Sequence, residues 1–181
     1  QRQMCIRDRL SSCASRQLEE VTFRRATISV PELMATAGKY FRKVYKGNKA
    51  HIDFKIQPLE GRITGDWNQL RFLLENLIDE ACSVTLDGAV CLSAREDGEF
   101  IRFLFTDMRR EKTREELNQL FYPDLSRMTA GEKGELYGTE YLVCKQIIRD
   151  HDEFAGRRGC RINAEPGKEG GFTIYFTLPK K

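Results

Sequence analysis

The chain has 181 residues, of which 40% are hydrophobic and 31% charged. This balance is typical of a folded globular domain and excludes a disordered or collagen-like chain. No apolar run approaches the roughly 18 residues that a membrane-spanning helix needs. A net charge of +3, spread over the whole length, favours no polyanionic partner, so nucleic-acid binding is not expected.

Six cysteines show neither a CxxC pair nor the spacing of a zinc site. They are Cys5, Cys13, Cys82, Cys91, Cys144 and Cys160. Four of them lie in apolar helix or strand patterns, where a free thiol behaves as a small buried hydrophobe. We therefore expect a reducing, cytoplasmic environment.

The first residues are expected to lie outside the natural protein. Gln3-Met-Cys-Ile-Arg-Asp-Arg9 is what a transposase adapter used in sequencing libraries encodes in one frame. We accordingly interpret residues 1–9 as a sequencing-adapter artefact and residues 10–28 as a linker or the end of an upstream helix. Residues 29–181 are then the folded domain.

The first predicted helix begins at the capping box Ser29-Val-Pro-Glu32 and ends near Gly47-Asn48. Ile52, Phe54 and Ile56 then alternate as one face of a strand. Asp66 can cap a second helix. Its apolar residues recur at helical spacing and are Trp67, Leu70, Leu74, Leu77, Ile78 and Ala81.

Asp97-Gly98 is the strongest hairpin signal, between a strand containing Val90 and Leu92 and one running to Asp107. A second capping box, Thr113 to Glu116, starts a short helix that ends near Phe121. Residues 124–138 hold three glycines and read as a long loop.

The last predicted helix runs from Thr139 to about His151, and strands follow at 160–164 and 172–178. Helices thus alternate with hairpin-paired strands that are apolar mostly on one face. This order predicts an α/β fold, a two-layer α/β sandwich whose helices cover one face of a mixed sheet.

Four segments carry a family resemblance. They are Asn76-Leu-Ile-Asp-Glu-Ala-Cys-Ser-Val-Thr85, Asp107 after its strand, Phe121-Tyr-Pro123, and Leu136-Tyr-Gly-Thr-Glu-Tyr141 before the last helix. In this order and spacing the chain, from Ser29 to Pro179, resembles the catalytic, ATP-binding domain of bacterial sensor histidine kinases, of the GHKL or Bergerat type. The resemblance implies the Bergerat ATP-binding fold, with ATP and Mg²⁺ as cofactors.

The resemblance assigns roles to the residues of the second helix. The family pattern is Asn-Leu-x-x-Asn-Ala-x-Lys-Tyr-Thr, and Asn76 and Thr85 match it as nucleotide-binding positions. Its second asparagine, which helps to hold Mg²⁺, is Glu80 here, and its phosphate-binding lysine is Ser83. Asn76 and Glu80 are therefore the candidate metal ligands, although a glutamate there is more commonly a solvated helix residue and adds negative charge near the phosphates.

Asp107 matches the aspartate that accepts a hydrogen bond from the adenine amino group, and Phe121 matches the phenylalanine motif at the family's separation. In the family, two glycines normally follow this aspartate. This chain has Arg109 and Glu111 at those positions. In the last glycine motif only Gly138 remains. Such glycines let the backbone approach phosphates closely, so their loss weakens that chemistry.

The two arginines that follow Asp107 and Met108 are expected to face solvent. Either of them, Arg109 or Arg110, is an alternative phosphate partner in place of the missing lysine. No catalytic residue is assigned.

These observations favour the C-terminal ATP-binding domain of a histidine-kinase-like signalling protein with weak or lost nucleotide binding. The alternative is an inactive pseudokinase that acts in protein–protein interaction or signal relay. A third hypothesis is a GHKL protein that phosphorylates serine or hydrolyses ATP. No glutamate of this sequence is placed clearly enough to be its catalytic residue. Expected partners are an upstream dimerisation and phosphoacceptor region or a response regulator, in a homodimer, with no membrane insertion by this segment.

Overall fold

The computed structural model describes residues 22–122 and 139–181. The loop predicted at 124–138 lies outside these residues. The helices and strands are, in chain order, β1 (Ala26–Ser29), α2 (Val30–Val44), β2 (Ile52–Gln57), β3 (Arg62–Gly65), α3 (Trp67–Cys82), β4 (Gly88–Asp97), β5 (Phe100–Asp107), α4 (Arg114–Gln119), α6 (Thr139–Phe154), β6 (Ile162–Pro166) and β7 (Phe172–Pro179).

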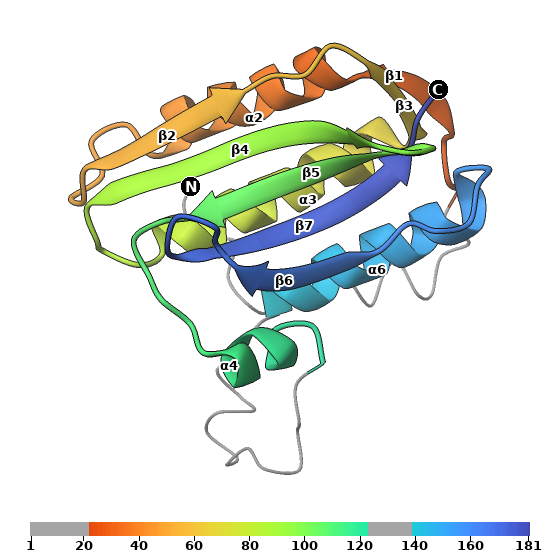
Figure 1. Ribbon diagram of the computed structural model, residues 1–181. Helices are drawn as coiled ribbons and strands as arrows, with labels where there is room; N and C mark the ends of the chain where they lie inside the picture. The colour runs from red at the N-terminus through yellow and green to blue at the C-terminus, as the bar shows by residue number, and fades with distance from the viewer. Residues whose placement is uncertain (1–21, 123–138) are drawn as a thin grey trace.

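A five-stranded mixed sheet with the order β2-β4-β5-β7-β6 forms one layer (Figure 1). Only the pair β2 and β4 is parallel; β4–β5, β5–β7 and β6–β7 are antiparallel. β1 and β3 form a separate antiparallel pair of four residues each. The predicted hairpin at Asp97-Gly98 is confirmed as the β4–β5 turn, where Gly98 has φ +61°.

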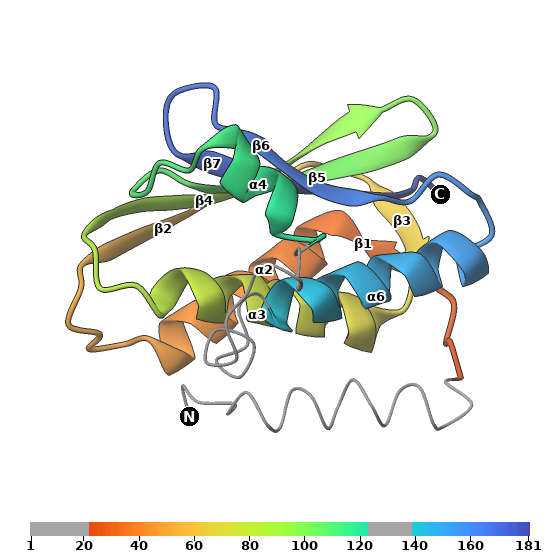
Figure 2. The same cartoon turned by 90° about the horizontal axis from the view of Figure 1, so that it is seen from below.

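Helices α2, α3 and α6 form the second layer and cover one face of the sheet, as Figure 2 shows. The predicted two-layer α/β sandwich is therefore confirmed. Alternate residues of β5 are buried, as are all residues of β7 except Tyr175, and the Phe103 and Phe176 rings stack 5.0 Å apart in the core. The apolar α3 side chains that are at most 2% exposed are Leu70, Leu73, Leu74, Leu77, Ile78, Ala81 and Cys82.

The beginning of α3 is held by a buried carboxylate. Asp66 accepts a hydrogen bond from the backbone N–H of Gln69 (3.1 Å), which confirms its predicted role as the helix cap. Its other oxygen accepts from the backbone N–H of Arg24 (3.0 Å). The backbone N–H of Asp66 donates to His151 Nε2 (3.0 Å), and the Phe23 ring lies edge-on to that imidazole, 4.8 Å away. Residues 23–24 are thereby fastened to both α3 and α6.

Helices α2 and α3 are joined through one carboxylate. The hydroxyls of Tyr40 (2.8 Å) and Tyr45 (2.5 Å) both donate to Asp79 Oδ1. Burial raises the pKa of Tyr45, and the bond to Asp79 raises it further, so this phenol stays protonated. The polar link fixes the last turns of the two helices against each other.

The structure adds a small pairing that the sequence did not indicate. β1 lies partly within residues 10–28, the segment expected to be a linker, and pairs with β3 in a register that places Ile28 opposite Ile63. Both isoleucines are at most 3% exposed. Within 22–122 and 139–181, no helix combines the length and apolar character needed to cross a bilayer.

The described cysteines match the expectation from the sequence. Cys82, Cys91, Cys144 and Cys160 are all free, and all except the half-buried Cys91 are buried. Burial raises the pKa of the Cys160 thiol to about 12, so this group remains protonated and unreactive.

Replacing Asp66 by alanine is expected to lower the free energy of unfolding by about 1–2 kcal/mol, because a buried helix cap and the tie to Arg24 are both lost. Urea denaturation measures this loss. The matched control is Ser29→Ala at the cap of α2, whose bond to the Glu32 N–H is 3.4 Å long and exposed. It should cost about 0.5 kcal/mol. Equal losses in the two variants would contradict the role given to Asp66.

Candidate functional site

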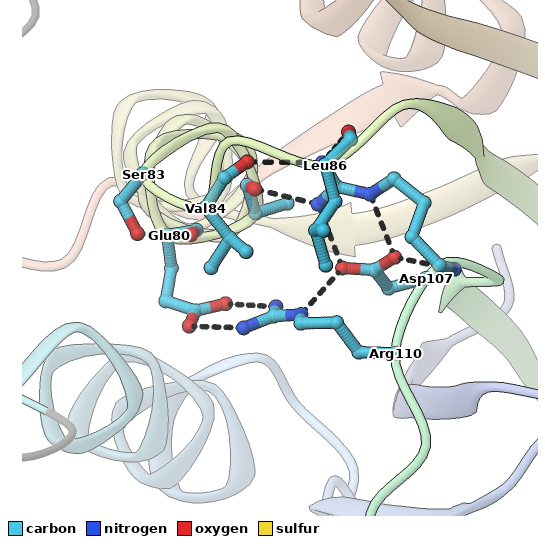
Figure 3. Close-up of polar contacts among 8 residues, drawn as sticks. Glu80, Ser83, Val84, Leu86, Asp107 and Arg110 are labelled. Atoms are coloured by element: carbon cyan, nitrogen blue, oxygen red, sulfur yellow. Dashed lines mark hydrogen bonds and ion pairs between the residues drawn. The ribbon is translucent and has the colours of Figure 1, made fainter. Parts of the chain in front are cut away.

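The candidate site lies where the end of β5 meets the end of α3 (Figure 3). β5 ends at Asp107, whose side chain is 1% exposed, and α3 ends at Cys82. The last carbonyl groups of a helix have no partner within the helix and carry partial negative charge. Carboxylate and carbonyl oxygens thus gather here and favour a group that donates hydrogen bonds.

In this structure the donor is Arg109. Its guanidinium binds both carboxylate oxygens of Asp107, through Nε (2.9 Å) and Nη2 (2.8 Å). The other N–H groups donate to the backbone carbonyls of Ala81 (2.6 Å), Val84 (3.2 Å) and Leu86 (2.9 Å). All five guanidinium donors therefore have acceptors, and the Arg109 side chain is 0% exposed.

A glycine opposite this arginine provides the space that it occupies. Gly88, the first residue of β4, has φ +137°, and a Cβ added there would lie 2.7 Å from Arg109 Cγ. Any larger residue would collide with the arginine stem as well as strain the backbone. The turn at Gly88 and the buried position of Arg109 thus depend on each other.

The next arginine connects Asp107 to α3. Arg110 Nε donates to Asp107 Oδ2 (3.0 Å), while Nη1 (3.3 Å) and Nη2 (3.0 Å) donate to the two carboxylate oxygens of Glu80. The Arg110 and Glu80 side chains are 15% and 19% exposed. A two-pronged bond of this kind fixes both groups and neutralises the charge of Glu80 (Figure 3).

Two opposing effects set the pKa of Asp107. Burial alone would raise it, because the charged form loses hydration. The hydrogen bonds from the Arg109 side chain and backbone, with the charges of Arg110 and Arg109, outweigh burial and lower the pKa below its ordinary value. Asp107 is therefore a carboxylate at neutral pH, with its acceptor positions already used.

Asn76 lies one helical turn before Glu80, so the two share a face of α3. Its amide donates to the Phe72 carbonyl (2.7 Å). Its Oδ1 atom is buried and, among the described residues, accepts no hydrogen bond. A buried acceptor without a donor is uncommon and marks a place where a ligand atom or water is accommodated.

Phe121 is 0% exposed and packs edge-to-face on Tyr141 of α6, with the ring centroids 5.5 Å apart. Lys145 Nζ donates to the Phe121 carbonyl (2.8 Å), which ties the end of the α4 segment to α6. The Tyr141 hydroxyl is buried without a well-formed bond to a described residue. Burial, reinforced by the nearby Glu80 charge, raises its pKa well above the ordinary value.

The remaining predicted site residues are not brought to this cluster. Thr85 is exposed in the loop between α3 and β4. Gly138 lies outside the described residues. Ser83, which stands at the family's lysine position, donates its hydroxyl to the Glu80 backbone carbonyl (2.6 Å) and so completes the helix end.

The side-chain oxygens at this site could serve as metal ligands only in part. Glu80 is the candidate carboxylate ligand, but both of its oxygens are bound by Arg110. Asn76 contributes one neutral oxygen without a partner. Among residues 22–122 and 139–181, no group of three histidine, cysteine, aspartate or glutamate side chains could hold a metal. Mg²⁺ would need Glu80 to leave Arg110.

The expectation that Arg109 and Arg110 face solvent was wrong. A charged side chain is buried only when its bonding capacity is met, and here Asp107 and three carbonyls meet it for Arg109. The sequence signals were the arginine at a glycine position two residues after Asp107, and Gly88. Glu111, at the second glycine position, accepts from the Gly171 N–H (2.9 Å), so it fastens the turn before β7.

Residues 65–181 match the family model described as "Histidine kinase-, DNA gyrase B-, and HSP90-like ATPase". The chain belongs to this ATPase family. The match begins at Gly65, immediately before the Asp66 cap of α3, and includes every residue of the cluster around Asp107.

A curated member of the family is similar to this chain. The adaptive-response sensory kinase SasA of Thermosynechococcus vestitus is 30% identical over 138 residues, which are 75% of this chain and 34% of SasA. The chain therefore spans about a third of the length of this curated relative.

Solved histidine kinases share the fold. The nucleotide-free catalytic domain of histidine kinase ThkA has a TM-score of 0.65 at 18% identity and covers 87% of this chain and 96% of its own. Acinetobacter baumannii AdeS gives 0.68 at 13% identity, over 96% and 76%. ThkA in complex with the response regulator TrrA gives 0.69 at 18% identity, over 96% and 48%.

Replacing Asp107 by asparagine is expected to lower the free energy of unfolding at pH 7 by about 3–5 kcal/mol, because it leaves the buried Arg109 guanidinium without its counter-ion. The lowered pKa of Asp107 means that its stabilisation is complete above the unfolded-state value of about 3.9 and is lost as pH falls through the lower folded-state value. The deficit of the variant should therefore shrink below about pH 4. Denaturant titrations at pH 2.5–7 measure it.

The control is Asp97→Asn, at the exposed ion pair with Arg102 (3.0 Å). It should change stability by less than about 1 kcal/mol. A deficit at Asp107 that stays constant from pH 7 to 2.5, or one as small as at Asp97, would contradict the buried ion pair.

Proposed function

We propose that this chain is the ATP-binding domain of a histidine-kinase-like signalling protein in which Arg109 has weakened or abolished nucleotide binding. One observation carries the proposal: both oxygens of Asp107 are bound by a guanidinium of the same chain. In the family, that aspartate accepts a hydrogen bond from the adenine amino group. The arginine takes the place of the base as donor.

Arg109 and an adenine base would compete as hydrogen-bond donors to Asp107, and the arginine is favoured. A bond between guanidinium and carboxylate is charge-assisted and stronger than one from a neutral amino group. Arg109 is also part of the chain, so it binds Asp107 without the loss of translational freedom that a nucleotide incurs. A base can enter only after Arg109 leaves Asp107 and the carbonyls of α3 and the following loop.

The phosphate end of the site supports the same proposal. Ser83 provides no cation at the lysine position, and its hydroxyl is turned to its own helix. Glu80 would present a negative charge to a triphosphate if Arg110 released it. The loss of even one or two kcal/mol weakens binding several-fold to more than tenfold. ATP and Mg²⁺ are thus cofactors that this domain would hold poorly, through Asn76 and Glu80.

The second candidate is a pseudokinase that keeps the sandwich for protein interaction or signal relay. The observation that favours it is that the arginine cluster is fully bonded and well packed. In either case we expect the domain to act next to an upstream dimerisation and phosphoacceptor region or with a response regulator, in a cytoplasmic homodimer. A structural neighbour, ThkA, is known in complex with a response regulator.

Calorimetry of the full chain with ATP and Mg²⁺ tests the proposal. The wild type should show no heat of binding, or a dissociation constant near millimolar. Arg109→Ala removes the Arg109 guanidinium from both Asp107 oxygens, leaving the backbone N–H of residue 109 and Arg110 as donors to them, and opens the space beside Gly88. It should therefore bind ATP at least tenfold more tightly than the wild type. Thermal melting with and without nucleotide verifies that each variant is folded and reports binding independently.

The matched control is Arg110→Ala, which removes the neighbouring arginine but leaves Arg109 on Asp107. It should not gain nucleotide affinity. Tight, Mg²⁺-dependent binding by the wild type that disappears in Asp107→Ala would overturn the proposal, and so would a gain in Arg110→Ala equal to that in Arg109→Ala.

A further inference from the structure

One short stretch of the chain is rich in basic residues and contains no acidic ones. Residues 33–52 contain five lysines and arginines and no aspartate or glutamate. The chain as a whole has 30 basic and 27 acidic residues, so the remainder holds 25 basic residues against 27 acidic ones. This stretch, which contains most of α2 and the loop before β2, is therefore a local excess of positive charge within a chain whose charge is otherwise nearly balanced.

Four of these cations lie on one face. Lys39, Arg42 and Lys43 lie on the last turns of α2, Lys46 follows in the turn after the helix, and all four are exposed and line the same depression. None of them forms an ion pair with any residue of 22–122 or 139–181. Their charge is thus not compensated within the described fold.

The same face is hollowed. A depression of about 620 Å³ is lined by these four cations together with Phe41 and Tyr45, and we name it the basic hollow. A second depression of about 300 Å³ adjoins it at Tyr45 and extends past Lys49 to Ile52. Both depressions are open to solvent rather than enclosed. The basic hollow combines an aromatic floor with a cationic rim.

The aromatic residues and the surrounding cations of the basic hollow together favour one class of anionic partner over the others. A nucleic acid or a membrane surface is bound by a broad basic face. Here the charge forms a single short row, and the aromatic residues lie within a concavity. This arrangement suits a protein segment whose carboxylates meet the row while one apolar side chain enters the hollow.

We propose that the basic hollow is a docking surface for an acidic protein segment that carries an apolar anchor residue. The surface is directly connected to the candidate site, because Tyr40 and Tyr45 bind Asp79, the residue before Glu80 on α3. Docking does not depend on whether ATP binds, so a failure of either proposal leaves the other in place.

Fluorescence anisotropy of a labelled 12-residue peptide, ten aspartates and glutamates around two adjacent leucines, tests docking to the full chain. The wild type should bind this peptide at least tenfold more tightly than Lys39→Glu/Lys43→Glu/Lys46→Glu. The wild type should bind a second peptide, with serines in place of the leucines, at least threefold more weakly than the leucine peptide. Amide chemical shifts of the labelled protein should change chiefly within 39–52.

The matched control is Arg161→Glu/Lys168→Glu/Lys181→Glu, which changes the net charge equally at exposed sites and breaks no described ion pair. It should retain wild-type affinity within twofold. Equal losses in the two triple variants, or shifts spread over the whole surface, would overturn the proposal. So would tighter α2-dependent binding to vesicles of phosphatidylcholine and phosphatidylglycerol (3:1) or to a 20-base-pair DNA duplex, since a membrane or nucleic acid would then be the partner.

Discussion

The buried pair of Asp107 and Arg109 is the interaction on which this end of the molecule depends. Removing a carboxylate and a guanidinium from water is costly, and the cost is met only when every donor and acceptor is matched. Here the matching involves the end of β5, the last turn of α3 and the loop that leads to β4. One side chain thereby ties the end of β5 to the end of α3 and the loop that follows it, 23 to 28 residues earlier in the sequence.

Helix α3 connects the features of the site. Its inner face is core, its first turn is capped by Asp66, and its last turn carries Asp79 and Glu80 on the polar side. Asp79 receives the two tyrosines of α2, while Glu80 receives Arg110. The helix thus has fixed partners at both ends, and its position relative to the sheet does not rely on a ligand.

Much of the fold followed from the sequence because its signals are local. The capping residues Ser29, Asp66 and Thr113 and the Asp97-Gly98 turn each act within a few residues of themselves, and all were confirmed. Strands β1 and β3 were not predicted, because four residues are too few to show a periodic pattern. The burial of Arg109 was not predicted for another reason: its three carbonyl acceptors lie 23 to 28 residues away, so its burial depends on the three-dimensional neighbourhood.

The attachment of residues 23–24 has a mechanical consequence. Arg24 is bound to the first turn of α3 through Asp66, and Phe23 contacts His151 near the end of α6. A force applied to the backbone before residue 22 would therefore act on both α3 and α6, and not on strand β1 alone. Since α3 is one continuous helix of 16 residues, it connects this attachment at its first turn to Glu80 and the Asp107 cluster at its last turn.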